Sequence, residues 1–223
     1  MQLTFVIPVH NEAPTLAALV KGILAHAGTD DLEILMVDDG STDGSVGTIT
    51  ELAARHPAVA SVRLGTHRGK TAALKAGFDR ARGNIVFTMD SDLQDDPAEI
   101  PGFLNALAEG HDLVCGWKRE RHDPSGRVRA SALYNRVVRW LFRIELNDVN
   151  CGFKAMRREV AQTVGSQLKR DYHRLIPVLA QRAGFRIGEV AVTHHARAHG
   201  RSKYGLWRYV SGLRDVVLLK LGW

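Results

Sequence analysis

The chain has 223 residues, of which 45% are hydrophobic and 24% are charged. This is the composition of an ordinary soluble globular protein, most simply of one domain, and it excludes a low-complexity chain. No stretch approaches the ~18 uncharged apolar residues that indicate a transmembrane helix, and no basic segment of a signal peptide precedes the first apolar run. Cys115 and Cys151 match neither a disulfide framework nor a zinc site, so we expect reduced thiols in a cytoplasmic protein.

The net charge of +6 hides two unlike halves. Residues 1–117 contain 8 Lys and Arg against 16 Asp and Glu, a balance of −8, whereas residues 118–223 contain 22 against 8, a balance of +14. An acidic half joined to a basic half indicates that the second half meets an anionic partner. Nucleic acid, phosphorylated lipid and a membrane surface are the candidates.

The first half of the chain alternates between short apolar runs and helical patterns. Near-continuous apolar runs of this length are typical of buried parallel strands. We expect strands over residues 3–9, 32–39, 60–65, 84–90 and 112–117, and helices over residues 13–27, 43–55 and 70–81. Asp43 and Thr15 are expected N-caps, and Gly83 is expected to end the third helix. The alternation predicts a doubly wound α/β sheet.

Polar clusters follow the first, second, fourth and fifth of these strands at their carboxyl ends, where open α/β sheets bind ligands, the last of them being "KRER" at residues 118–121. The first is "HNE" at residues 10–12, which either caps the next helix or hydrogen-bonds a nucleobase. The second contains Asp38 and Asp39, which either form Asx turns or bind a ribose or a base edge.

The acidic stretch "DSDLQDDP" follows the fourth strand. Asp90, Asp92 and Gln94 stand at alternate positions, so their side chains share one face of an extended segment. Three oxygen donors on one face favour Mg2+ or Mn2+, with substrate phosphates completing the shell. The residues Asp95 and Asp96 precede Pro97, a pattern typical of a helix N-terminus. We therefore expect Asp90 and Asp92 to hold metal, and Asp95 or Asp96 to cap a helix.

Six stretches carry a family resemblance by their order and spacing: "FVIPVHNE", "VDDGSTDGS", "RGKTAALKAG", "MDSDLQDDP", "CGFKAMRREV" and "HARAHGRSKYG". Through them nearly the whole chain resembles the inverting glycosyltransferases of family 2. It resembles more narrowly the polyprenyl-phosphate glycosyltransferases, which include dolichol-phosphate and undecaprenyl-phosphate enzymes. The resemblance implies an α/β GT-A fold, a Rossmann-like open and mostly parallel sheet with helices on both faces, plus a C-terminal amphipathic helix.

The resemblance also implies an activity, namely metal-dependent inverting transfer of a sugar from a GDP- or UDP-linked donor to a polyprenyl phosphate. One domain would span residues 1–223. Residues 1–117 would bind nucleotide sugar and metal, residues 118–205 would bind the acceptor and include a mobile loop, and residues 206–223 would form the C-terminal helix. Mg2+ or Mn2+ would be held by Asp90, Asp92 and Gln94.

Further roles follow from the same resemblance. The catalytic residues would be Asp92, Arg127 and Ser131, the last two meeting the acceptor phosphate. That phosphate has a second pKa near ~6 and is already charged at pH 7, so no general base is expected. The nucleotide-sugar site would comprise Pro8, His10, Glu12, Val37, Asp39, Asp90, Ser91, Lys118, His173, Arg174, Arg197, Ser202 and Lys203. Lys118 stands where the family usually has Arg, which keeps the charge but loses the planar fork, and the neighbouring Arg119 could replace it.

Two basic stretches with interleaved apolar residues, Arg127–Ile144 and Leu206–Trp223, are either core-facing helices or helices at a membrane interface. The lipid acceptor favours the second interpretation, for a peripheral protein at the cytoplasmic face of the membrane. Many relatives continue into transmembrane helices, so three interpretations stay open: the chain is peripheral by itself, it relies on a membrane-embedded partner subunit, or it is part of a longer protein. The alternatives are a soluble or polysaccharide acceptor, or a non-catalytic nucleotide-binding partner. Nucleic-acid binding is disfavoured because the strand ends are acidic.

Overall fold

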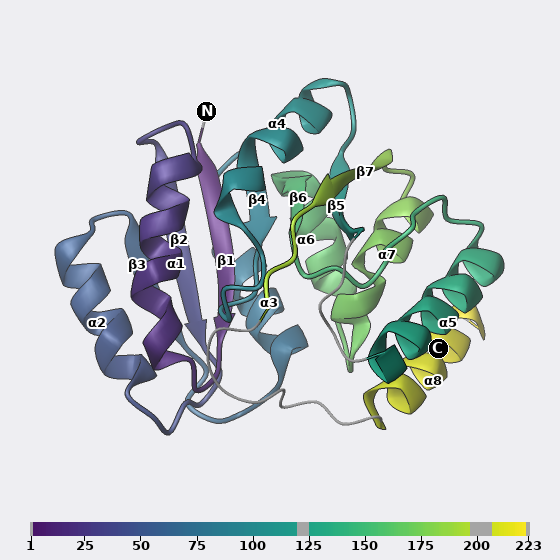
Figure 1. The fold of residues 1–223 in the computed structure, drawn as a ribbon, viewed down its shortest axis with the longest axis horizontal. Coiled ribbons are helices and arrows are strands. Elements are labelled where there is room, and N and C mark those ends of the chain that lie inside the picture. The colour runs from purple at the N-terminus through teal and green to yellow at the C-terminus, as the bar shows by residue number, and fades with distance from the viewer. Residues whose placement is uncertain (1, 120–124, 197–206, 222–223) are drawn as a thin grey trace.

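The structure of the chain, a computed structural model, describes residues 2–119, 125–196 and 207–221. These residues form a seven-stranded sheet in the order β3-β2-β1-β4-β6-β5-β7 (Figure 1). The strands are β1 (Leu3–Val9), β2 (Leu32–Asp38), β3 (Val59–Arg63), β4 (Ile85–Thr88), β5 (Leu113–Lys118), β6 (Lys154–Arg157) and β7 (Ile187–Val192). Neighbours pair in parallel except for β6, which is antiparallel to both β4 and β5. The expected open and mostly parallel sheet is therefore confirmed.

Helices cover both faces of this sheet (Figure 1). The longer helices are α1 (Ala13–His26), α2 (Ser45–Arg55), α3 (Lys70–Phe78), α4 (Ile100–Ala108), α5 (Ser125–Phe142), α6 (Arg158–Gln167), α7 (Ile176–Arg182) and α8 (Trp207–Leu221), and the short 3-10 helices are η1 (Pro97–Glu99) and η2 (Tyr172–Leu175). One hydrophobic core contains buried residues of α1, α2 and α4, and a second contains buried residues of α3, α5, α6, α7 and α8.

The alternation of side chains along β1 explains the two cores. Leu3, Phe5 and Ile7 belong to the core beneath α1, whereas Val6 belongs to the core beneath α3. Both sets are fully buried, which is why the strand is a continuous apolar run in the sequence. The helix α3 approaches β1 closely, since a Cβ at Gly77 would stand 2.2 Å from a methyl group of Val6.

The caps expected at Thr15, Asp43 and Gly83 were wrong. Thr15 lies inside α1, where its hydroxyl donates to the carbonyl oxygens of Glu12 and Ser91 at 2.8 and 2.5 Å. Gly83 does not end α3, which finishes at Phe78; its backbone N–H instead donates to the hydroxyl of Thr4. Asp43 precedes the cap residue of α2 by one position and accepts a hydrogen bond from the N–H of Ser45.

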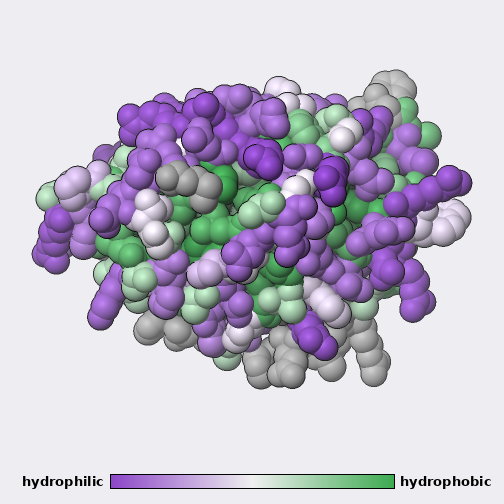
Figure 2. Space-filling model, turned by 90° about the horizontal axis from the view of Figure 1, so that it is seen from above, coloured by the Kyte–Doolittle hydropathy of each residue, from purple (hydrophilic) through white to green (hydrophobic). Residues whose placement is uncertain are grey.

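The parallel strands all run in one direction, downward in the view of Figure 1, so their carboxyl ends share one edge of the sheet. Figure 2 shows the opposite end of the molecule, whose surface is mainly hydrophilic with hydrophobic side chains near its middle. The polar clusters that follow β1, β2 and β4, together with Lys118 and Arg119 at the end of β5, are therefore brought together at the edge away from that face.

Candidate active site at the carboxyl ends of the strands

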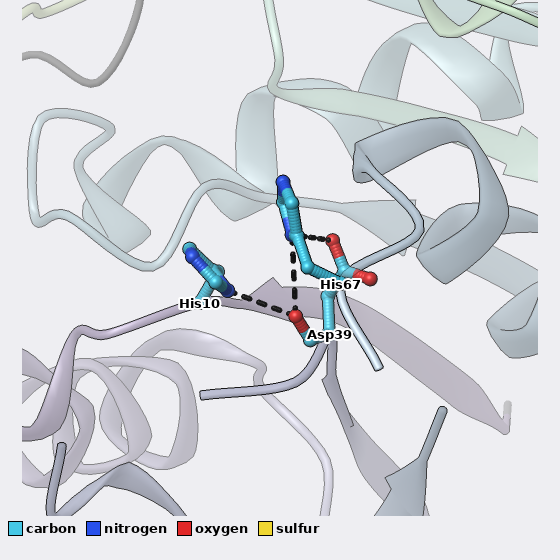
Figure 3. A group of neighbouring side chains, drawn as sticks. All are labelled: His10, Asp39 and His67. Carbon is cyan, nitrogen blue, oxygen red and sulfur yellow. Dashed lines mark hydrogen bonds and ion pairs between the residues drawn. The ribbon is translucent and has the colours of Figure 1, made fainter. Parts of the chain in front are cut away.

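One end of this edge is formed by His10, Asp39 and His67, which come from the segments after β1, β2 and β3 (Figure 3). The His10 Nδ1 lies 2.8 Å from the backbone oxygen of Asp39, and the His67 Nδ1 lies 2.9 Å from the Asp39 carboxylate. The two imidazole rings lie 4.2 Å apart between centroids. The ligand atoms of the three residues fall within 4.8 Å of one another, a spacing that could hold a metal ion.

The Asp39 carboxylate is also held by the backbone ahead of α3. It accepts hydrogen bonds from the N–H groups of Arg68 at 2.6 Å and Gly69 at 2.8 Å. Gly69 is the N-cap of α3 and has a φ of 90°, a conformation that a residue with a Cβ rarely adopts. The buried carboxylate of Asp39 therefore fixes the point at which α3 begins, and Lys70 is the first residue of that helix.

Lys70 reaches from α3 to the carboxylate of Asp90, the first acidic residue after β4, and forms an ion pair with it. Although 34% of the Asp90 side-chain surface remains exposed, packing around it works against ionisation. The attraction and hydrogen bond of Lys70 outweigh that effect, so the pKa of Asp90 lies below its usual range. Gly152 closes off the other side, where a Cβ would stand 2.7 Å from the carboxylate.

Asp92 and Gln94, the other two residues of the predicted metal set, differ in their surroundings. Asp92 is nearly buried, with 7% of its surface exposed, and its Oδ1 accepts a hydrogen bond from the backbone N–H of Gln94. Ser91 is buried beside it. The amide nitrogen of Gln94 lies 3.3 Å from the carbonyl oxygen of His195, in the segment after β7. The metal-binding roles of Asp90, Asp92 and Gln94 remain predictions.

Asp96 and Asp95 have separate roles. The Asp96 carboxylate accepts a hydrogen bond from the N–H of Ala98 and caps η1, as expected for one of the two residues. Asp95 is buried and forms an ion pair with Lys118 at the end of β5, with 2.8 Å between Nζ and Oδ1. Burial opposes the charge of Lys118, but the attraction of Asp95 outweighs it, so the pKa of Lys118 lies above its usual range.

The adjacent residues His173 and Arg174, in η2, face different surroundings. His173 lies beside the site, where its Nδ1 is 2.8 Å from the hydroxyl of Thr71. Burial, reinforced by the charges of Lys70 and Arg174, holds the pKa of His173 well below its usual value, so the imidazole is neutral at pH 7. Arg174 is buried in the packing of α5 and α8, where a Cβ at Gly212 would contact both Arg174 and the ring of Tyr134.

The other predicted site residues fall into three groups. Pro8 and Val37 lie in β1 and β2, and the backbone N–H of Glu12 donates to the hydroxyl of Ser45. Ser131 is buried in α5. Arg127 belongs to α5, but its side chain is outside the described part of the structure, and Arg197, Ser202 and Lys203 are outside the described residues.

Two residues at this edge, His67 and Lys70, were not among the predicted site residues. Neither belongs to an apolar run or to an acidic cluster. The sequence feature that could have identified Lys70 is its position directly after Gly69, at the expected start of a helix whose N-terminus meets the strand ends. His67 carries no such feature.

Residues 4–165 of the chain match the family model for glycosyl transferase family 2. The chain therefore belongs to glycosyl transferase family 2.

Two curated relatives resemble the chain over nearly its whole length. Over 218 residues the chain is 36% identical to an undecaprenyl-phosphate 4-deoxy-4-formamido-L-arabinose transferase of Aeromonas hydrophila, covering 96% of this chain and 66% of that protein. It is also 36% identical over 224 residues to a dodecaprenyl-phosphate galacturonate synthase of Rhizobium johnstonii, covering 97% of this chain and 66% of that protein. The chain thus spans slightly less than two thirds of the length of these relatives.

Solved structures share the fold at lower identity. A mannosyltransferase from Pyrobaculum calidifontis in complex with GDP-Man and Mn2+ matches 97% of this chain and 64% of its own, with a TM-score of 0.70 and 23% identity. A glucosyl-3-phosphoglycerate synthase from Mycobacterium tuberculosis in complex with Mn2+, UDP and phosphoglyceric acid matches 99% and 78%, with a TM-score of 0.73 and 23% identity. These neighbours confirm the expected GT-A fold.

Proposed function

We propose that this chain transfers a sugar from a GDP- or UDP-linked donor to a polyprenyl phosphate, in a metal-dependent reaction that inverts the anomeric carbon. The observation that carries the proposal is the convergence of His10, Asp39, Asp90 and Asp92 at one edge of a family 2 fold. The names of the two relatives refer to undecaprenyl phosphate and dodecaprenyl phosphate, which supports a polyprenyl phosphate as the acceptor.

On the donor side, the base would lie near His10 and Asp39, and the diphosphate would extend toward Asp90 and Asp92. These two carboxylates suit a hard divalent cation. Asp90 already pairs with one positive charge, the ammonium of Lys70, so a cation fits at this position. A bound Mg2+ or Mn2+ would neutralise the charge that develops on the leaving diphosphate. Gln94 would contribute an oxygen from the same segment.

The reaction needs one displacement. A phosphate oxygen of the lipid attacks the anomeric carbon while the bond from that carbon to the diphosphate oxygen breaks, giving a glycosyl phosphate lipid and a nucleoside diphosphate. Both substrates are anions, so the residues of the chain have to position them against mutual repulsion. Arg127 and Ser131 would orient the acceptor phosphate, and Arg197, Ser202 and Lys203 would close over the diphosphate.

A substrate panel tests this proposal. The protein is incubated with UDP- and GDP-linked sugars and a short-chain polyprenyl phosphate, with Mn2+, with Mg2+ or with a chelator. We expect one donor to yield a glycosyl phosphate lipid with inverted anomeric configuration by NMR, and the chelator to abolish the product. A product that forms equally well with the chelator would disprove the metal dependence. Transfer to a soluble sugar but to no polyprenyl phosphate would disprove the acceptor.

The surface formed by α5 and α8 favours a lipid acceptor. These helices lie side by side (Figure 1). Among the described residues, four of the five exposed large hydrophobic side chains belong to them: Leu133, Trp140, Val217 and Leu221, of which Trp140 is the most exposed at 78%. Exposed arginines such as Arg136 and Arg139 lie among them. No helix in the described ranges is sufficiently long and apolar to cross a bilayer.

We expect the double variant Leu133→Ser/Trp140→Ser to bind anionic liposomes about tenfold or more weakly than the wild type, because it removes apolar area that would enter the headgroup region. Co-sedimentation with liposomes measures the effect, and high salt should release part of the wild-type protein by screening its arginines. Leu24→Ser is the matched control, since Leu24 is the fifth exposed hydrophobic residue and lies on α1. An equal loss in the control would contradict the assignment of this surface.

A further inference from the structure

The carboxylates of Asp90 and Asp92 lie two residues apart at the end of β4, and Lys70 is paired with the first of them. The side chain of Lys70 is 19% exposed and that of Asp90 is 34% exposed, so the pair is partly shielded from water. Lys118 and His173 also act electrostatically on Asp90, but His173 is neutral at pH 7 and Lys118 is paired with Asp95. Among the residues that the structure describes, Lys70 is therefore the cation that directly contacts the Asp90 carboxylate.

The position of Lys70 connects the two ends of the site. Asp39 lies at the end of the site where we propose that the nucleobase binds. Its carboxylate accepts hydrogen bonds from the N–H groups of Arg68 and Gly69, the two residues immediately before Lys70. Any ligand that moves Asp39 or the Gly69 turn therefore moves the backbone that supports the Lys70 side chain. The same residue that contacts Asp90 begins α3, whose N-terminus favours an anion.

A divalent metal ion on Asp90 and the ammonium of Lys70 cannot share the carboxylate without strong repulsion at contact distance. One of the two has to leave, and a diphosphate is an anion that Lys70 could pair with instead. We propose that Lys70 is an internal counter-cation: its ammonium pairs with the Asp90 carboxylate in the free protein, and pairs with the donor diphosphate instead when metal binds to Asp90. The inference rests on the proposed function, because it takes Asp90 as a metal ligand.

The exchange makes metal binding depend on nucleotide. In the free protein, Mn2+ has to break the ion pair between Lys70 and Asp90, and no diphosphate is present to offset that loss, so Mn2+ alone binds weakly. With the diphosphate present, Lys70 gains a partner, and the two ligands strengthen each other by the same factor. Removing the positive charge at position 70 should abolish the competition, so Mn2+ alone should bind more tightly.

The test is a titration with Mn2+ alone, followed by the EPR signal of free Mn2+ or by calorimetry, on the wild type, Lys70→Met and Lys70→Gln. We expect both variants to bind Mn2+ about tenfold more tightly than the wild type, within the range typical of coupling between sites. Lys75→Met is the matched control, because Lys75 lies on the same helix and pairs with Asp79, away from Asp90. It should bind Mn2+ like the wild type. Thermal unfolding shows that each variant is folded, and glutamine keeps a polar side chain if methionine is poorly tolerated.

Repeating the titration with UDP, and separately with GDP, separates two kinds of failure. If the wild type binds Mn2+ and the Lys70 variants bind it no more tightly, the counter-cation role is wrong while the metal site stands. A gain in Lys75→Met as large as in Lys70→Met would indicate only a change in net charge and would also overturn the inference. If none of these proteins binds Mn2+ with or without either nucleotide, both the metal site and the inference are wrong.

Discussion

Replacing Asp92 with asparagine should reduce the rate of sugar transfer by about 100-fold or more, because it removes one of two carboxylates proposed to hold the metal ion against the leaving diphosphate. The fold should survive the change. The Asp92 Oδ1 accepts a hydrogen bond from the N–H of Gln94 at 3.2 Å, and the amide oxygen of asparagine can accept the same bond. The measurement is kcat at saturating donor and Mn2+, together with the thermal unfolding midpoint.

Asp96→Asn provides the control for Asp92→Asn. Asp96 stands four positions further along, accepts a hydrogen bond from the N–H of Ala98 and caps η1, a role that asparagine performs about as well as aspartate. The control removes one negative charge from the same segment and should retain nearly full activity. Normal turnover by Asp92→Asn, or an equal loss in both variants, would refute the assignment of Asp92 to the metal.

The positions of the strand-end residues were predictable from the sequence because parallel strands share their carboxyl edge. Asp39, Asp90 and Asp92 each follow a buried apolar run, and the general rule for open α/β sheets brings such ends together. The second half of the sheet was harder to predict. β6 has only four residues and begins with the buried Lys154, so no apolar run marks it. Its antiparallel pairing with β4 and β5 is a long-range feature that local patterns do not encode.

The pairing of charges within the site could not be predicted for a related reason. The sequence shows four aspartates after β4 and several cations elsewhere, but not which carboxylate meets which cation. Lys70 is 20 residues from Asp90 in the chain. His173 and Arg174 are adjacent, yet the turn of η2 sends one to the hydroxyl of Thr71 and the other into the packing of α5 and α8. Such divergence depends on tertiary packing, which the adjacent letters "HR" do not reveal.

The same limitation applies to Lys118, for which family resemblance predicts a contact with the nucleotide sugar. In the structure its side chain is 12% exposed and forms an ion pair with Asp95, whose side chain is 0% exposed. A buried ion pair is costly to break from one side, because the partner is left as an uncompensated charge. The structure therefore gives Lys118 a structural role, whereas its contact with the donor remains a prediction. Measurements of stability and of nucleotide binding can separate these two roles.

We expect Lys118→Met to lower the free energy of unfolding by roughly 3–5 kcal/mol, the usual loss when one partner of a buried pair is removed. The double variant Lys118→Met/Asp95→Asn should recover most of that loss, since no unpaired charge remains. Denaturant midpoints measure both.

Arg119→Ala is the control. Arg119 lies 5.3 Å from the ring centroid of Trp117, and its replacement should lower the free energy of unfolding by no more than about 1 kcal/mol. If the double variant is as unstable as Lys118→Met, an unpaired Asp95 is not the cause of the loss of stability. If the double variant is stable but binds UDP and GDP much more weakly than the wild type, Lys118 also contacts the donor, as the family resemblance predicts.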